Sequence, residues 1–211
     1  MNLVIVAFTC ERDAGFMQPW RSLIGKCYPG AKVIVAGEDV ENYWVTRGAP
    51  AAVRHTLAET AHNHRHADWI IKTDVDVAHL RPDWLLNHLD RGQVIGCQQR
   101  RDFPWGFQGL AYAIRTPFVH RMMQAYDCPG CPCNKQKDED CAMSLAAYIA
   151  DPNAIHLHRY DPLGKGIYSN WNPSGCRSIK LYKQRFDLVH CGMEPTREES
   201  LEIFRQFSLD D

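Results

Sequence analysis

The chain has 211 residues, 45% of them hydrophobic and 23% charged, and its formal net charge is −1. These values are ordinary for a globular protein with its own core, and they exclude a disordered or strongly charged chain. A charge near zero gives no global attraction to nucleic acid or to an acidic membrane surface. The sequence also lacks a run of about 18 apolar residues, so no segment is expected to span a bilayer.

The first residues, Met1 to Phe8, lack the basic start and the cleavage site of a signal peptide. They read better as the first strand of the fold. The chain contains nine cysteines, an odd count. Without a secretory signal, reduced thiols in a cytoplasmic protein are the expectation.

A β-α-β unit opens the chain. The continuous apolar run Leu3–Phe8 predicts a strand covered on both faces, and a polar loop follows over residues 9–15. Apolar positions spaced for a helix run from Phe16 to Cys27, and a second short strand is predicted over Lys32–Ala36. We expect parallel strands joined by a right-handed crossover. The connection contains no G-x-G-x-x-G, so the dinucleotide fingerprint is missing.

A second helix is predicted over residues 50–66, and an acidic segment follows it. Trp69 to Ile71 reads as a buried strand that leads to Asp74 and Asp76. Because strand residues alternate in direction, both carboxylates are expected to point the same way at the carboxyl end of the strand. Open α/β sheets bind ligands beyond these ends, and two carboxylates aimed at one point favour a cation between them.

The middle of the chain alternates short helices and strands. The expected order is a helix over 82–90, a strand over 94–97, a loop over 100–106, a strand over 107–114, and a helix that begins at Thr116 and Pro117. We expect Thr116 to cap that helix, and Val119, Met122, Met123 and Tyr126 to form its core-facing stripe.

A turn-rich insertion carries Cys128, Cys131 and Cys133, with Cys141 following. Four thiolates could bind a structural zinc ion, but the spacing is not that of a standard zinc knuckle and favours free or weakly paired thiols. The next helix is predicted to begin near Lys137 and to end near Ala150, with Ala142, Leu145, Ala146 and Ile149 facing inward. Acids in its first turn are favoured by the helix dipole alone.

The last part of the chain has a short strand over 155–158 and a long loop over 160–178. Cations in and after this loop suit a lid over a phosphorylated ligand, although a solvated surface loop is the alternative. A final strand is predicted over 186–192 and contains His190. Thr196 and Glu199 form a capping box for the terminal helix.

Four of these features stand in the order found in one enzyme family. Asp74-Val75-Asp76 matches a metal-binding D-x-D motif, and Phe107-Gln108-Gly109 matches a glycine loop beside the acceptor. Asp138-Glu139-Asp140 matches an x-E-D motif at a helix start, and His190 matches a C-terminal histidine that completes metal coordination. With this ordered set, the chain resembles the GT-A-fold, nucleotide-sugar-dependent glycosyltransferases over most of its length.

The resemblance implies a set of site residues. The implied metal is Mn²⁺ or Mg²⁺, held by Asp74, Asp76 and His190. Asp140 is implied as the base in an inverting enzyme, with Glu139 nearby to bind the acceptor. The donor is expected to contact Thr9, Glu11, Arg12, Asp39, Lys72, Val75 and Lys165. The acceptor is expected to contact Trp105, Phe107, Gln108, Gly109 and Trp171.

The fold expected from the resemblance is α/β: a single-domain, Rossmann-like GT-A fold with a mostly parallel central sheet flanked by helices. Residues 1–100 would bind the nucleotide-sugar, and residues 101–211 would hold the acceptor and the catalytic groups, with the cysteine-rich insertion over 128–141. The implied activity is transfer of a hexose, with glucose the expected sugar, from a UDP-sugar to a hydroxyl acceptor. No membrane partner is expected.

Three alternatives stay open at this stage. The same chemistry could act on nucleic acid, such as a 5-hydroxymethylated base in phage DNA, because Arg100, Arg101 and several aromatic residues could serve a backbone and a flipped base. The chain could instead be a zinc-stabilised binding module without catalysis, in which the cysteines matter. A nucleotidyltransferase would also place acids beside a sheet, but its glycine-rich, lysine-bearing first loop is absent.

Overall fold

The computed structural model describes residues 1–9, 11–37, 49–100, 103–136, 138–158, 168–170, 178–191 and 196–209. The elements in chain order are β1 (Leu3–Phe8), η1 (Glu11–Phe16), α1 (Met17–Cys27), β2 (Lys32–Ala36), α2 (Ala49–Asn63), β3 (Trp69–Asp74), β4 (Val77–His79), α3 (Asp83–Leu86), β5 (Val94–Arg100), β6 (Phe103–Arg115), α4 (Thr116–Asp127), η2 (Pro132–Lys135), α5 (Glu139–Ala150), β7 (Ile155–His158), β8 (Tyr168–Asn170), α6 (Ile179–Arg185), β9 (Leu188–His190) and α7 (Arg197–Ser208).

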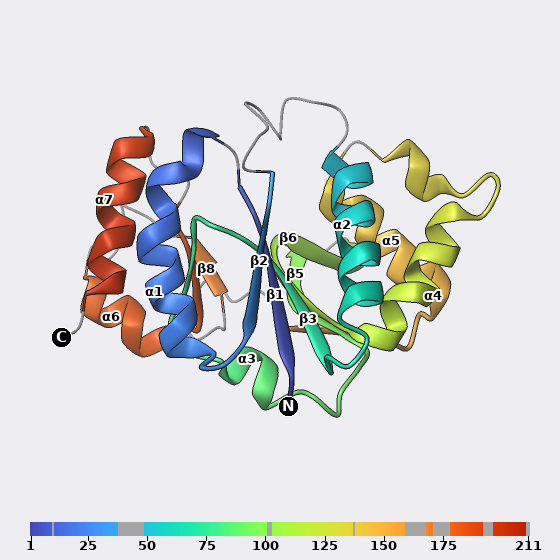
Figure 1. The fold of residues 1–211 in the computed structure, drawn as a ribbon, viewed down its shortest axis with the longest axis horizontal. Helices are drawn as coiled ribbons and strands as arrows, with labels where there is room; N and C mark the ends of the chain where they lie inside the picture. The colour runs from blue at the N-terminus through green and yellow to red at the C-terminus, as the bar shows by residue number, and fades with distance from the viewer. Residues whose placement is uncertain are drawn as a thin grey trace.

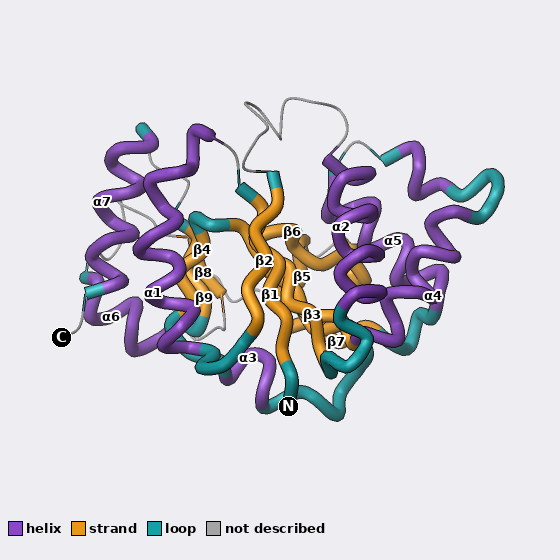
Figure 2. Tube along the Cα trace, in the orientation of Figure 1, coloured by secondary structure: helices purple, strands orange, loops and turns teal. Residues whose placement is uncertain are grey.

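A six-stranded sheet runs through the middle of the molecule in the order β2-β1-β3-β6-β5-β7 (Figure 2). The pairs β1–β2, β1–β3 and β5–β7 are parallel, whereas β6 is antiparallel to both of its neighbours, β3 and β5. The five strands other than β6 therefore share one direction, so their carboxyl ends lie toward the same edge of the sheet. The expected parallel β1-α1-β2 unit is present.

Helices cover both faces of this sheet. In Figure 1, α1, α6 and α7 lie on one side of it, and α2, α4 and α5 lie on the other. Alternate residues of β1 enter two separate apolar layers: Ile5 and Ala7 pack on the α1 side, and Val4, Val6 and Phe8 on the α2 side. Burial on both faces explains why the strand reads as a continuous apolar run.

A smaller three-stranded sheet, in the order β4-β9-β8, lies beside the α1, α6 and α7 layer (Figure 2). It begins where the chain leaves β3: residues 75 and 76 form a turn, and β4 starts at Val77. This second sheet matters for function because it brings the last part of the chain to the carboxyl end of β3.

The predicted fold class, an α/β fold with a mostly parallel central sheet flanked by helices, is confirmed. Two local details were also right: the stripe of α4 is buried, and the capping box of Thr196 and Glu199 is formed. Among the described residues, no helix combines the length and the apolar character needed to cross a membrane.

Several local predictions were wrong. Much of the polar loop after β1 is the 3-10 helix η1, α2 ends at Asn63, and α3 has only 4 residues. Thr116 lies inside α4 after its N-cap Arg115. Ile149 of α5 is 45% exposed, and Met143 is buried in its place. Tertiary packing selects the inward face of α5, because α5 packs on both α4 and β6.

Candidate active site

Asp74 and Asp76, at the carboxyl end of β3, lie in different environments. Asp74 is the last residue of the strand, and its Oδ1 accepts a hydrogen bond from Lys72 at 2.9 Å. Asp76 lies in the following turn, and its Oδ2 is 3.1 Å from Nη1 of Arg197. The strand ends at Asp74, so the alternation of side chains expected from the sequence does not extend to Asp76. The two carboxylates therefore have different hydrogen-bonding partners.

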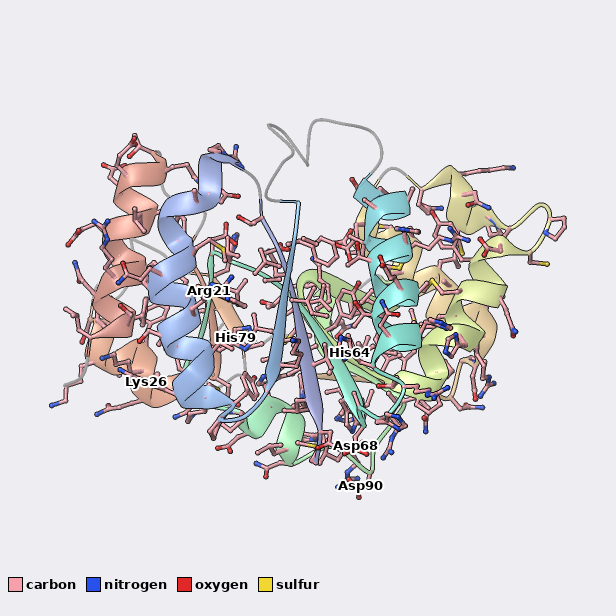
Figure 3. All side chains as sticks on the ribbon, viewed as in Figure 1. Arg21, Lys26, His64, Asp68, His79 and Asp90 are labelled. Atoms are coloured by element: carbon pink, nitrogen blue, oxygen red, sulfur yellow. The ribbon has the colours of Figure 1, made fainter. Side chains whose placement is uncertain are left out.

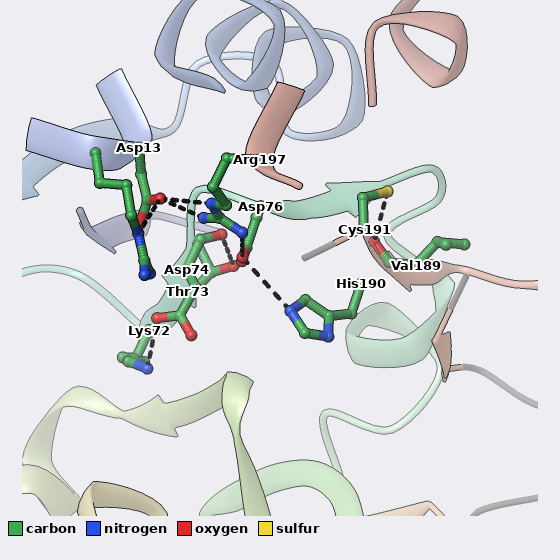
Figure 4. A network of polar contacts seen from close by, with 10 residues as sticks. Asp13, Lys72, Thr73, Asp74, Asp76, Val189, His190, Cys191 and Arg197 are labelled. Carbon is green, nitrogen blue, oxygen red and sulfur yellow. Dashed lines mark hydrogen bonds and ion pairs between the residues drawn. The ribbon is translucent and has the colours of Figure 1, made fainter. Parts of the chain in front are cut away.

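Asp76 and His190 come together, as the sequence predicted. Strand β9 pairs with β4 so that His190 lies opposite Val77, the residue after Asp76. The backbone N–H of Cys191 donates to the Asp76 carbonyl at 2.9 Å. This pairing places Nε2 of His190 3.4 Å from Oδ2 of Asp76 (Figure 4). Residues more than one hundred positions apart in the sequence therefore form one polar site.

The sequence reasoning missed Arg197 and Asp13. Arg197, at the start of α7, donates from Nε to Oδ1 of Asp13 at 2.9 Å (Figure 4). Its guanidinium carbon also lies 4.8 Å from the centre of the Phe16 ring. The same guanidinium holds Asp76. The sequence does contain a signal for Arg197. A cation in the first turn of a helix is disfavoured by the helix dipole, so its presence there indicates a compensating interaction with an acid.

The two oxygens of Asp76 differ in a way that fits a cation. Oδ2 meets both His190 and Arg197, whereas Oδ1 is buried without a hydrogen-bond partner among the described residues. Burial alone would raise the pKa of Asp76, but His190 and Arg197 outweigh burial and hold that pKa at about 2. An ionised carboxylate with one unpartnered oxygen beside an imidazole is a donor set suited to Mn²⁺ or Mg²⁺.

Lys72 is the centre of a second network. Its side chain is fully buried, and its ammonium group lies 2.9 Å from Asp74 and 3.2 Å from Oε2 of Glu139. Lys72 also donates to the carbonyl of Gly109. The hydroxyl of Tyr112 donates to Oε1 of Glu139 at 2.7 Å. The network ties the end of β3 to the start of α5 across β6.

Charge and burial oppose each other in this network. Burial raises the pKa of Asp74 to about 7, although the Lys72 ammonium partly offsets that rise. Burial would lower the pKa of Lys72, but Asp74 and Glu139 together raise it. Burial also raises the pKa of Glu139, against the opposing effects of Lys72 and Tyr112. The lysine is therefore a charged partner that permits the two acids to lie buried together.

Gly109 has no room for a side chain. A Cβ atom there would lie 2.5 Å from Oε2 of Glu139 and 3.2 Å from Cβ of Asp140. The backbone of β6 can therefore approach α5 only because residue 109 is glycine. The next acid, Asp140, is half-buried, and its Oδ1 accepts a hydrogen bond from the Cys141 N–H at 2.9 Å. Burial raises the pKa of Asp140.

A chain of buried hydrogen bonds lies behind Asp74. The Thr73 hydroxyl donates to the Asp74 carbonyl at 3.1 Å and contacts Nε2 of His79 at 2.9 Å. Tyr28 accepts from Trp84 Nε1 at 2.7 Å and contacts Nδ1 of His79 at 3.1 Å. With the Thr73 proton on the Asp74 carbonyl, His79 donates from Nε2 to Thr73 and can accept at Nδ1 from Tyr28. Burial lowers the pKa of His79 to about 3, so the imidazole is neutral, and it lies in the interior beside α1 (Figure 3).

The remaining predicted site residues divide into several groups. Phe107 is fully buried in the apolar layer and packs on Tyr112, so its side chain has no surface for an acceptor, which corrects that prediction. Lys72 is likewise enclosed. Thr9 and Val75 are buried at the ends of β1 and β3, and Arg12 lies 3.5 Å from Asp13. Gln108 is half-buried and donates to the Gln98 carbonyl at 3.5 Å.

Asp39, Lys165 and Trp171, together with most of the lid segment 160–178, lie outside the described residues, as do the side chains of Glu11 and Trp105.

The four cysteines considered for zinc do not gather around one point. Cys131 and Cys133 are buried and joined by a hydrogen bond from the Cys133 N–H to the Cys131 sulfur at 3.4 Å, whereas Cys128 is exposed. Burial raises the pKa of the Cys133 thiol to about 12, which disfavours the thiolate that zinc requires. Buried thiols that pack under α4 and α5 describe this insertion better.

Comparison with solved structures shows that this fold is shared with several glycosyltransferases. A glycosyltransferase involved in the glycosylation of the major capsid of PBCV-1 matches with a TM-score of 0.62 and 11% identity, over 98% of this chain and 100% of that one. LgtC, solved as an active-site mutant, matches with a TM-score of 0.54 and 13% identity, over 95% of this chain and 94% of that one.

The bifunctional glycosyltransferase WbbM matches with a TM-score of 0.57 and 10% identity, over 99% of this chain and 50% of that one. No protein-family model and no curated protein sequence matches the chain. At these identities the likeness establishes the fold, which the chain shares with these glycosyltransferases, and leaves the chemistry to be argued from the site itself.

Proposed function

We propose that the protein is a metal-dependent glycosyltransferase that moves a hexose, with glucose the first candidate, from a UDP-sugar to a hydroxyl acceptor. The observation that carries the proposal is the environment of Asp76. Its buried Oδ1, which has no hydrogen-bond partner within the described part of the chain, and the adjacent His190 lie where the chain leaves the carboxyl end of β3. Ligands of open α/β sheets bind at such ends.

Asp76 and His190 would hold the divalent cation. Lys72 occupies Oδ1 of Asp74, and no ligand atom of Asp74 lies within 4.8 Å of both Asp76 and His190, so Asp74 would have to turn Oδ2 toward the ion to serve as a third ligand. Such a cation, when bound, neutralises the charge that develops on the diphosphate leaving group. Arg197 fixes Asp76 from the opposite side, and Asp13 and Phe16 fix Arg197. These contacts keep the carboxylate oriented before any donor arrives.

Asp140 is the candidate base. It would accept the proton of the acceptor hydroxyl while that oxygen attacks the anomeric carbon and the bond to the UDP oxygen breaks. Its raised pKa makes it a stronger base than an ordinary aspartate. Glu139 suits a different role, because both of its oxygens are engaged, one by Tyr112 and one by Lys72. We therefore assign Glu139 to positioning of Gly109 and Asp140.

The test is release of UDP from UDP-sugars by the purified protein with Mn²⁺, compared between wild type and Asp76→Asn. Loss of a direct metal ligand should reduce turnover by more than about 100-fold, beyond the range for the loss of an outer contact. Glu59→Gln is the matched control, because Glu59 lies in α2 with its side chain 64% exposed. Equal turnover in Asp76→Asn and wild type would refute the assigned metal role.

The donor class has a separate test. Thermal unfolding with a panel of nucleotide-sugars, each with and without Mn²⁺, should show stabilisation by UDP-sugars that depends on the metal, since a ligand that binds only the folded state stabilises it. A larger shift with nucleotides of another base would overturn the choice of UDP.

A further inference from the structure

Three histidines form a cluster that the proposed reaction does not use. His88 lies in the turn after α3, and His156 and His158 lie two residues apart on β7, so they project from the same face of that strand. One ring nitrogen of each residue lies within 4.8 Å of the others. In the part of the chain that the structure describes, no other group of three or more His, Cys, Asp or Glu residues comes together in this way.

The backbone brings the two segments close together. The N–H groups of Gln93 and Val94 both donate to the Ala154 carbonyl, at 2.7 and 3.0 Å. A Cβ atom at Gly92 would lie 2.7 Å from the Ala154 carbonyl oxygen and 3.2 Å from Cβ of His156. Glycine at position 92 thus permits the turn that carries His88 to pack against β7.

The hydrogen bonds of the cluster leave nitrogen atoms without partners. Nε2 of His158 donates to the Trp84 carbonyl at 2.8 Å, so this nitrogen carries the proton and Nδ1 carries a lone pair. Nδ1 of His88 and Nε2 of His156 are buried and have no hydrogen-bond partner among the described residues. A buried polar atom left unpaired is destabilising, and a bound ion would supply the missing partner.

The bond from His158 to a carbonyl is the usual arrangement behind a metal-binding histidine. Metal-ligating imidazoles commonly donate their second ring N–H to a backbone carbonyl or a carboxylate, which fixes the tautomer and the ring orientation. Burial lowers the pKa of His158 to about 4 and also lowers the pKa of His156. Both rings are therefore neutral near pH 7, in the form that binds metals and without mutual repulsion.

The rings are close enough to converge with small adjustments. Their centroids are 4.3 Å apart for His88 and His158, 5.0 Å for His88 and His156, and 5.1 Å for His156 and His158. Tetrahedral zinc with Zn–N distances near 2.0–2.1 Å requires nitrogen atoms roughly 3.3 Å apart. His88, which lies in a turn and is half-buried, is the ring best able to move inward.

We propose that His88, His156 and His158 bind one first-row transition-metal ion of the zinc class, at a site separate from Asp76 and His190. Three imidazole nitrogens suit Zn²⁺, Cu²⁺ or Ni²⁺, whereas Mn²⁺ and Mg²⁺ favour the carboxylate-containing site. The ion would join the edge strand β7 to the segment between α3 and β5.

The experiment uses the full chain after removal of metals with a chelator, and Zn²⁺ alone is the probe. Zinc affinity and stoichiometry are measured for wild type, His156→Gln, Asp76→Asn and the control His55→Gln, whose side chain is 78% exposed on α2. We expect His156→Gln to weaken one zinc site by more than about 100-fold, the upper end of the loss caused by removing an outer-shell partner. Asp76→Asn and His55→Gln should keep that site.

Unchanged zinc affinity and stoichiometry in His156→Gln would overturn the proposal. X-ray absorption of zinc-loaded wild-type protein provides a reading that does not depend on a variant's folding. Imidazole nitrogen ligands are expected there, and thiolate sulfur ligands would assign the zinc to the cysteines and also overturn the proposal. UDP release with Mn²⁺ by His156→Gln distinguishes the two sites, because it should stay at the wild-type level whatever the zinc result.

Discussion

Lys72→Met removes the one cation that two buried acids share. Methionine fills a similar apolar volume, so the change tests charge rather than packing. In the wild type, the Lys72 ammonium contacts Asp74 at 2.9 Å and Glu139 at 3.2 Å, with its side chain fully enclosed. The variant leaves two carboxyl groups facing each other without a counter-charge, at the point where β3 meets α5.

The magnitude has two bounds. Breaking a buried ion pair by removing one partner usually costs about 3–5 kcal/mol of stability. Uptake of a proton limits the loss, and burial already raises the pKa of Asp74 to about 7 in the wild type. Below pH 7 both proteins therefore hold the Asp74 proton, whereas at pH 8 only the variant takes it up, at a cost of about 1.4 kcal/mol per pH unit. We therefore expect Lys72→Met to lose about 3–5 kcal/mol at pH 8 and roughly 1–2 kcal/mol less than that at pH 5.

The sign follows from proton binding. Loss of the Lys72 ammonium raises the pKa of the buried carboxyl groups above their already raised wild-type values, so the variant binds protons at a higher pH than the wild type does and its loss of stability shrinks as the pH falls from 8. Urea unfolding of both proteins, followed by circular dichroism at the two pH values, measures the difference. Lys32→Met, at an exposed lysine of β2, is the control and should change stability by less than about 0.5 kcal/mol. A loss below about 1 kcal/mol at pH 8, or one that does not shrink at pH 5, would refute the reasoning.

Two further predictions concern Gly109 and His79. Gly109→Ala should lose about 1–3 kcal/mol in urea unfolding, because its Cβ would overlap Oε2 of Glu139. Gly25→Ala, at an exposed position in the last turn of α1 with nothing within 4 Å, should gain up to about 1 kcal/mol. An unchanged stability in Gly109→Ala would mean that β6 and α5 can separate freely. Burial holds the pKa of His79 at about 3 against an ordinary 6.5, so the unfolded state binds the proton first and stability should fall by about 1.4 kcal/mol per unit as pH drops from 6.5 toward 3. In His79→Gln, the part of the fall in stability with decreasing pH that comes from His79 should disappear between pH 6 and pH 4. If stability falls equally steeply in the variant and the wild type, the buried chain of hydrogen bonds does not depend on a neutral imidazole.

Much of the fold could be read from local pattern. Alternation and apolar runs placed β1, β2, β3 and β7, and the ordered acids led to the GT-A fold. The failures were also local in origin. Thr116 has the residue type of a cap but lies within α4, and Phe107 lies beside a glycine but faces the core. In both places packing against neighbouring elements decided the outcome, and propensity did not.

The residues of the candidate site also fall into those that the sequence predicted and those that only the structure revealed. The sequence singled out Asp74 and Asp76 because they follow an apolar strand, and it singled out Glu139, Asp140 and His190 through the resemblance to the glycosyltransferase family, whose motifs show in one dimension. The sequence did not show that Arg197 and Asp13 hold Asp76, that Lys72 bridges Asp74 and Glu139, or that His88 meets two histidines of β7.

What the sequence determined by itself was therefore the elements and the acids at their ends, because periodicity and chain direction are properties of neighbouring residues. Only the tertiary structure decided which side chains share a point in space. Those contacts arise where β4 pairs with β9, where β6 crosses to α5, and where Gly92 lets a turn approach β7. Each of these contacts joins segments that are far apart in the chain. The charge and burial of the side chains there, and the lone pairs that they present, therefore depend on tertiary packing and cannot be read from the local sequence.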